Sequence, residues 1–188
     1  MKRVVCLLLL LPATAGAVEK QHHLGVNAGF ALLPVSKKDV PSMGAAFVAH
    51  WAYGLTDQWQ IALEAGYSIV SLGEQKDIVV TDMSGMKKLP NNRPAHVLQG
   101  SAGVNYVFDI LRWVPYAGIY ATAFGLLGGN LPNPKFVMGG TLAAGLDYQF
   151  TRAFTAGLAV RQHFPFSNMD DYPAFTQIML RAELVWGW

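Results

Sequence analysis

The last stretch of the chain, Phe175 to Trp188, reads FTQIMLRAELVWGW and decides which fold the sequence favours. Counted back from the end in steps of two, every residue down to Ile178 is apolar. The residues between them carry the polar groups, including Arg181 and Glu183. A side-chain period of two predicts a β-strand with one apolar and one polar face. A strand that ends on Trp-Gly-Trp favours an apolar face turned to lipid and a polar face turned to a lumen, with aromatic rings at the headgroup level.

The same stretch resembles the carboxy-terminal signal of bacterial outer-membrane β-barrels. In that signal, a final aromatic residue and alternating apolar positions are read by the barrel-assembly machinery. Leu184, Trp186 and Trp188 match the pattern, whereas Glu183 stands where such signals often carry glycine. The resemblance implies that the assembly machinery is a partner of this chain.

The amino terminus has the three parts of a secretory signal peptide. A basic start at Lys2 and Arg3 precedes an apolar run from Val4 to Leu11, and Ala15-Gly16-Ala17 supplies small residues for cleavage. We therefore expect residues 1–17 to be removed and residues 18–188 to form one barrel domain. The alternative, a membrane-anchoring helix, is disfavoured because the run is too short to span a bilayer. Cys6 is the single cysteine, so the mature chain would have no disulfide.

Charge and composition exclude several classes of protein. Without Lys2 and Arg3, 12 basic residues remain against 12 acidic ones, which argues against a nucleic-acid partner. The chain is 52% apolar, with 19 glycines and 12% aromatic residues. Its best uncharged helical candidate, residues 113–131, contains Pro115 and four glycines, which disfavour a helix. Because only helices and closed barrels satisfy their backbone groups in lipid, the composition favours a barrel.

Alternation along the chain predicts eight strands joined by connections that are alternately long and short. The predicted strands are Leu24–Leu32, Met43–Tyr53, Trp59–Ile69, Ala95–Phe108, Trp113–Leu126, Phe136–Phe150, Phe154–Phe164 and Phe175–Trp188. The longest loop, Gly73 to Pro94, is expected to lack regular structure and to be the most mobile part. A soluble periplasmic β-sandwich is the alternative, but it has no reason to collect every long loop at one end. We predict an all-β fold: an eight-stranded antiparallel transmembrane up-and-down β-barrel.

Aromatic residues flank all three short turns and predict a girdle at a membrane interface. They are Trp51, Tyr53, Trp59, Tyr106, Phe108, Trp113, Tyr148, Phe150 and Phe154. With this girdle, the whole mature chain resembles the small eight-stranded outer-membrane barrels of the OmpA and OmpX kind. The resemblance implies a monomer in the outer membrane of a Gram-negative bacterium, in contact with membrane lipid and lipopolysaccharide.

The polar faces of the predicted strands would fill a narrow lumen, because eight strands leave space only for side chains. The inward charges are Glu64, Asp147, Arg161, Arg181 and Glu183, together with His50 and His163. They should form ion pairs, since an unpaired buried charge is costly. Neighbouring strands suggest Arg161 with Glu183, and Arg181 with one of the acids. This network indicates a structural plug; the alternative is a narrow, gated path for small or hydrophobic solutes.

The segment that follows His163 suggests an enzymatic alternative, a lipid A deacylase. The lipid A deacylases pair His with Ser two residues on, followed by Asn, whereas here His163 precedes Ser167 and Asn168. Four residues along a strand are about 13 Å apart, too far for proton transfer. We also expect His22-His23 to be exposed and idle, and Asp170-Asp171 to be a solvated loop tip or a site for cations that bridge lipopolysaccharide. The sequence thus predicts no enzyme, no cofactor and no metal, but a structural or surface-interaction barrel.

Overall fold

The computed structural model describes residues 20–33, 42–70, 75–82, 85–91, 95–108, 110, 112–128, 134–166 and 174–187. The predicted signal peptide, the terminal Trp188 and the Asp170-Asp171 pair lie outside these residues. The strands are β1 (His22–Leu33), β2 (Ser42–Gly54), β3 (Trp59–Val70), β4 (Gln75–Asp82), β5 (Gly85–Asn91), β6 (Ala95–Val107), β7 (Trp113–Gly128), β8 (Lys135–Thr151), β9 (Phe154–Pro165) and β10 (Phe175–Trp186). Among the described residues, no helix is long and apolar enough to cross a membrane.

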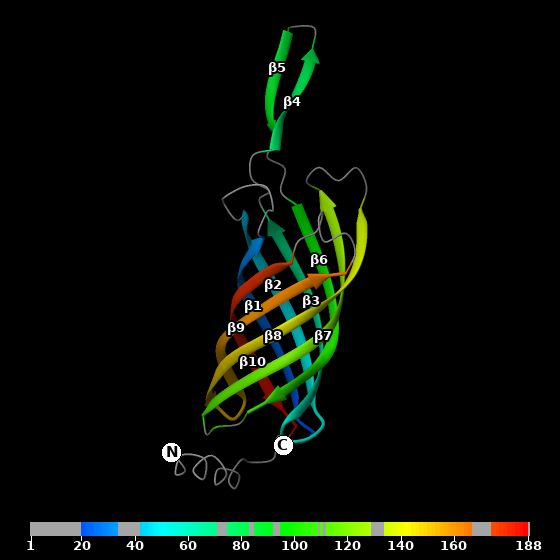
Figure 1. The fold of residues 1–188 in the computed structure, drawn as a ribbon. Coiled ribbons are helices and arrows are strands. Elements are labelled where there is room, and N and C mark those ends of the chain that lie inside the picture. The colour runs from blue at the N-terminus through cyan, green and yellow to red at the C-terminus, as the bar shows by residue number, and fades with distance from the viewer. Residues whose placement is uncertain are drawn as a thin grey trace, which may run out of the picture.

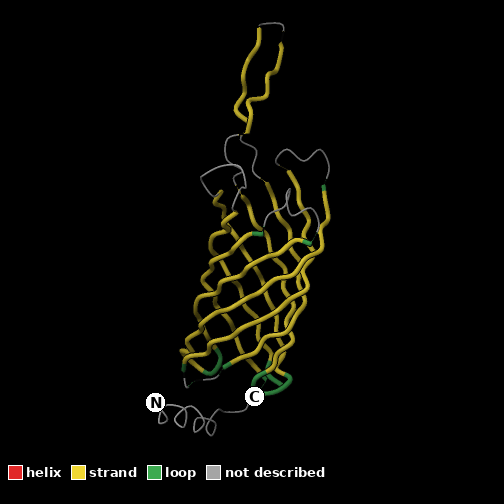
Figure 2. The backbone as a smooth tube through the Cα atoms, in the orientation of Figure 1, coloured by secondary structure: helices red, strands yellow, loops and turns green. Residues whose placement is uncertain are grey.

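Eight of these strands form one closed antiparallel barrel in the order β1-β10-β9-β8-β7-β6-β3-β2 (Figures 1 and 2). Each barrel strand pairs with the barrel strands next to it along the chain, and β1 pairs with β10 to close the cylinder. The predicted all-β, eight-stranded up-and-down barrel is confirmed.

The prediction of an irregular loop from Gly73 to Pro94 is wrong for most of its length. Within it, β4 and β5 pair as a separate two-stranded sheet, which Figure 1 shows standing beyond the long-loop end of the barrel. The run Ile78-Val79-Val80 supplies the β-branched residues that favour a strand. This run is short, and the charged, glycine and proline residues around it are typical of loops, so the sequence pattern favoured a loop.

The two faces of the barrel wall differ sharply in polarity. Large apolar side chains point outward, for example Leu180 at 69% exposure, Val26 at 62% and Ile119 at 60%. The inward face is mainly polar, and its buried members include Asn27 and Gln177. The apolar faces therefore do not meet in a shared core, as a β-sandwich would require.

Aromatic rings cluster on the outer face at the short-turn end. Trp59 and Tyr106 have centroids 5.0 Å apart, and Trp113 and Tyr148 are also 5.0 Å apart. His22 belongs to this aromatic cluster at the seam between β1 and β10. The centroid of its ring lies 5.0 Å from that of Tyr53 and 5.7 Å from that of Trp186. The predicted clustering of aromatic residues beside the short turns is observed, and it includes a histidine that the sequence did not indicate.

Inside the barrel, a glycine can provide the space for a large side chain of the neighbouring strand. Tyr116 on β7 pairs with Gly145 on β8, and its ring occupies the space where a side chain at that position would lie. A Cβ atom added at Gly145 would lie 2.3 Å from the Tyr116 ring atom Cε1. By contrast, a Cβ atom added at Gly100, which faces outward, would meet nothing within 4 Å.

We expect Gly145→Ala to destabilise the barrel by about 1–3 kcal/mol, because the added methyl group overpacks the lumen against Tyr116. The matched change Gly100→Ala should be neutral or stabilising by up to about 1 kcal/mol, since it restricts only the unfolded chain. Urea unfolding of the refolded protein in detergent micelles measures both. Equal effects of the two substitutions would contradict this packing.

Candidate functional site

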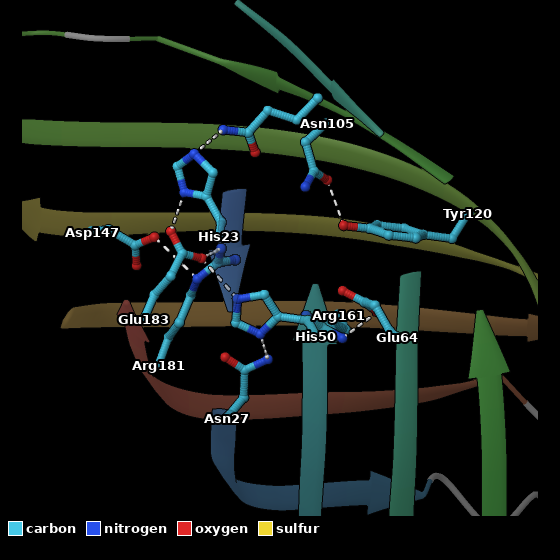
Figure 3. A network of polar contacts seen from close by, with 11 residues as sticks. His23, Asn27, His50, Glu64, Asn105, Tyr120, Asp147, Arg161, Arg181 and Glu183 are labelled. Carbon is cyan, nitrogen blue, oxygen red and sulfur yellow. Dashed lines mark hydrogen bonds and ion pairs between the residues drawn. The ribbon is translucent and has the colours of Figure 1, made fainter. Parts of the chain in front are cut away.

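The charged residues of the lumen fall into two clusters, and the one nearer the short turns centres on Glu183 of β10 (Figure 3). One carboxylate oxygen of Glu183 accepts a hydrogen bond from His23 Nδ1 at 2.7 Å. The other accepts from His50 Nε2 at 2.7 Å and also from the Arg181 guanidinium. Glu183 is thereby held by three donors that come from β1, β2 and β10. We call Glu183, Arg181, Asp147, His23 and His50 the lower cluster.

Arg181 joins the two acids of the lower cluster. Its Nε lies 3.2 Å from Asp147 Oδ2, and its guanidinium carbon lies 4.5 Å from the centroid of the Tyr116 ring. Arg181 and Asp147 are on β10 and β8, and both pair with Gly157 of the intervening β9. Because Gly157 has no side chain, the guanidinium and the carboxylate can meet across β9.

The second charged cluster, the upper pair, is an ion pair between Arg161 and Glu64. Arg161 Nη1 donates to Glu64 Oε2, and the two residues are 0% and 7% exposed. They lie on β9 and β3, which are four strands apart around the eight-stranded barrel. This pair therefore reaches from one wall of the lumen to the opposite wall.

The expected pair of Arg161 with Glu183 is wrong. The register of β9 against β10 places Arg161 opposite Gln177, six residues from Glu183. That offset corresponds to about 20 Å along the strand, beyond the reach of an arginine side chain. Arg161 pairs across the lumen with Glu64, and Arg181 takes both Glu183 and Asp147.

His23 was expected to be exposed and idle, and this prediction is also wrong. His23 is 7% exposed, donates to Glu183 and lies 3.4 Å from Gln60 Nε2 through its other ring nitrogen. The signal was present in the sequence, because alternation from Leu24 places residue 23 on the inward face. The predicted strand began one residue too late to include it.

Polar side chains continue above the charged clusters, toward the long-loop end. A chain of hydrogen bonds links Ser101, Thr122, Thr141 and His163 on four neighbouring strands, at 3.0, 2.7 and 2.8 Å. On the other wall, Gln177 donates to Ser68 Oγ at 3.0 Å. These groups form a polar belt around the inner wall, in which His163 Nε2 has no hydrogen-bond partner among the described residues.

His163 lies in the lumen and not on the outer face where lipid A chemistry would take place. It is 1% exposed, stacks on Phe175 at 4.4 Å and meets the edge of Phe124 at 5.6 Å between centroids. Phe124 and Phe175 belong to an apolar cluster with Val97. Its predicted companions Ser167 and Asn168 are outside the described residues. This apolar cluster narrows the lumen near the long-loop end.

The lumen contains a cavity of about 60 Å³ at the short-turn end. Its walls include Tyr116, Asp147, Thr155, Arg181 and Glu183. This volume is enough for a few water molecules and far too small for a drug-sized ligand. Within the described ranges, no three His, Cys, Asp or Glu residues are arranged to hold a metal ion.

The upper pair should behave as one energetic unit. Glu64→Ala or Arg161→Ala alone should cost about 3–5 kcal/mol, because each leaves a buried charge without its partner. The double variant should cost clearly less than the sum, which gives a large coupling energy in a double-mutant cycle measured by urea unfolding. The matched cycle of Arg161→Ala with Glu183→Ala should give coupling near zero. The opposite ranking would contradict the observed pairing.

Neither a protein-family model nor a curated protein sequence matches the chain. Solved structures do match, among them barrels of the bacterial proteins OprF, Ail and OprG. The amino-terminal β-barrel domain of Pseudomonas aeruginosa OprF aligns with a TM-score of 0.60 at 15% identity, over 89% of this chain and 98% of that one. Yersinia pestis Ail, solved with the heparin analogue sucrose octasulfate, aligns with a TM-score of 0.59 at 11% identity, over 89% and 99%. The P. aeruginosa outer-membrane protein OprG aligns with a TM-score of 0.55 at 13% identity, over 90% and 98%. The closed ladder and these alignments together show that the chain has the fold of small eight-stranded outer-membrane β-barrels.

Proposed function

We propose that this protein is a non-enzymatic barrel that spans the outer membrane of a Gram-negative bacterium, with its lumen sealed by its own side chains. The observation that carries the proposal is the inverted polarity of the wall. Exposed leucine, valine, isoleucine and phenylalanine side chains cover the outside, and paired charges fill the inside. Such a surface is unstable in water and suited to hydrocarbon.

The height of the apolar band on the outer face supports a position across the membrane. At the short-turn end the band stops at the aromatic girdle, which includes Trp59. Toward the long loops it continues to Ile69, which is 37% exposed and lies beside a polar pair in which Tyr67 donates to His96 Nδ1 at 2.6 Å. Trp59 and Ile69 lie on β3, ten residues apart, which is about 33 Å along the strand and about 25 Å once the strand is tilted. This matches an apolar band of roughly 25 Å.

The filled lumen supports a structural role over transport. The Arg161–Glu64 pair joins opposite walls, and the apolar cluster of Phe124, Phe175 and Val97 lies above it. A solute would have to break the buried ion pair and displace these rings. Breaking one buried ion pair alone costs several kcal/mol.

Membrane lipid, lipopolysaccharide and the barrel-assembly machinery are the partners that we propose. Leu184 and Trp186 point outward at 56% and 43% exposure, where lipid and the machinery could reach them. Trp188, the last residue of the proposed assembly signal, lies outside the described residues. We propose a monomer in which the long loops and the β4–β5 hairpin face the exterior and serve surface interactions.

A narrow channel for small or hydrophobic solutes is the second candidate. The cavity at the short-turn end favours it, because that cavity already provides space for a few water molecules inside the lumen. Conduction would then depend on movement of the Arg161–Glu64 pair.

The membrane placement predicts that a charge is harmful at the middle of the outer face and tolerated at its edge. Ile119→Arg places a cation in the centre of the apolar band and should cost about 2–4 kcal/mol. The control Leu55→Arg, in the short turn between β2 and β3, should cost at most about 1 kcal/mol. Cell fractionation with unboiled and boiled gels measures how much folded barrel reaches the outer membrane. A water-soluble barrel would instead accept Ile119→Arg without loss.

The sealed lumen predicts that the purified protein is silent in planar lipid bilayers. Arg161→Ala removes the residue that crosses the lumen and should leave the protein silent if the remaining plug is structural. A rise in conductance with Arg161→Ala would favour the channel, and conductance of the unmodified protein would overturn the sealed-lumen proposal. Thr122→Val, which removes a hydroxyl group from the polar belt, serves as the control.

A further inference from the structure

The two charged clusters of the lumen differ in their charge balance. In the upper pair, Arg161 and Glu64 cancel. In the lower cluster, Arg181 is the single cation beside two carboxylates, Glu183 and Asp147. Counted over these three residues alone, the lower cluster has one negative charge in excess, in a site where both acids are 4% exposed. Such a buried charge is costly unless a positive group joins it.

The same part of the lumen contains three oxygens that lack a hydrogen-bond partner among the described residues. They are Tyr116 OH, Asp147 Oδ1 and Thr155 Oγ1. Their residues are 5%, 4% and 6% exposed, and all three line the 60 Å³ cavity. Arg181 Nε, from another residue of the cavity wall, also lacks a hydrogen-bond partner, although it is ion-paired with Asp147. Buried polar atoms nearly always have a partner, so three unpaired oxygens around one cavity indicate that something occupies it.

Neither a proton nor water alone accounts for both observations. Protonation of His23 or His50 would cancel the charge, but both imidazoles are engaged with Glu183 and would leave the three oxygens unpaired. Water molecules would satisfy the oxygens but would leave the charge. A proton together with water would account for both observations, and so would one small cation in the cavity; only the cation makes stability depend on which cation is present in solution.

We propose that this cavity binds one small monovalent cation through Asp147 Oδ1, Tyr116 OH and Thr155 Oγ1. Carboxylate and hydroxyl oxygens are ligands for hard cations, and they also accept hydrogen bonds from a primary ammonium group. The charge deficit is one, and the cavity offers too few oxygens for the six to eight that Ca²⁺ takes. The ligand is therefore a sodium-type ion or a small primary ammonium ion. Asp147 then bridges this cation and Arg181, and so ties the cation to the lower cluster.

The test uses the full mature barrel refolded in micelles and compares its thermal midpoint in sodium, ammonium and choline chloride at equal ionic strength. Choline is too large for the cavity, so it controls for salt screening. Sodium-23 NMR line broadening reports binding directly. The key variants are Tyr116→Phe and Thr155→Val, which remove one ligand oxygen each without a change in shape, and Asp147→Asn, which removes the charge.

Saturable stabilisation by sodium or ammonium over choline is the expected result. Tyr116→Phe and Thr155→Val should each weaken the apparent affinity about tenfold, and Asp147→Asn should abolish binding. Thr122→Val is the matched control: it removes a buried lumen hydroxyl away from the cavity and should leave the cation dependence intact. Stabilisation by ammonium without sodium would assign the site to an amine ligand.

Three results would overturn the proposal. The first is a midpoint that is the same in sodium, ammonium and choline chloride. The second is a cation dependence that survives both Tyr116→Phe and Thr155→Val. The third is stabilisation by Tyr116→Phe in every salt, which would mean that the unpaired hydroxyl group has no ligand and is only a cost. These two variants keep the test decisive even if Asp147→Asn does not fold.

Discussion

The pairing of β1 with β10 is the interaction on which the rest of this structure depends. It runs without a break from His22 opposite Trp186 to Leu32 opposite Thr176. Closure leaves the barrel no free edge, so each backbone group of the wall finds its partner within the sheet. It also fixes, for each strand, which alternate side chains point outward and which point into a narrow lumen that the side chains largely fill. The apolar exterior and the crowded polar interior both follow from that single closure.

The crowded interior explains why the polar residues appear in coupled groups. A charge in so narrow a space can be paired only by another side chain, and a long side chain can reach the opposite wall as well as a neighbouring strand. Arg161 accordingly pairs across the lumen, and Arg181 pairs past a glycine on the strand between. Buried ion pairs of this kind add little net stability, but they penalise every register in which the partners are separated. The pairs thus select one stagger of the strands over its neighbours.

The sequence predicted the faces of the wall and not the contacts across it. A period of two is a local property, so the inward placement of Glu64, Asp147, Arg161, Arg181 and Glu183 could be derived strand by strand. Which of them meet depends on the stagger of strands far apart in the chain, and no local pattern contains that information. The same limit explains the wrong Arg161–Glu183 pair. His23 has the same inward phase as the strand that follows it, but the strand predicted from the alternation begins at Leu24 and leaves it out. The β4–β5 hairpin was missed because its short β-branched run is surrounded by residues typical of loops.

The seam has a topological consequence. Because His22 is paired with Trp186, the start of the first barrel strand and the end of the last one lie side by side at the same end of the cylinder. The meander therefore has no privileged starting strand: a short linker across the seam would turn the wall into an endless ladder. Reopening that ladder within the β4–β5 hairpin, outside the cylinder, would give a circularly permuted chain with the same inter-strand hydrogen bonds. In such a permutant, β10 would still pair with β1 but would no longer be the last strand of the chain. Its role as a terminal signal for assembly could then be studied apart from its role in closing the barrel.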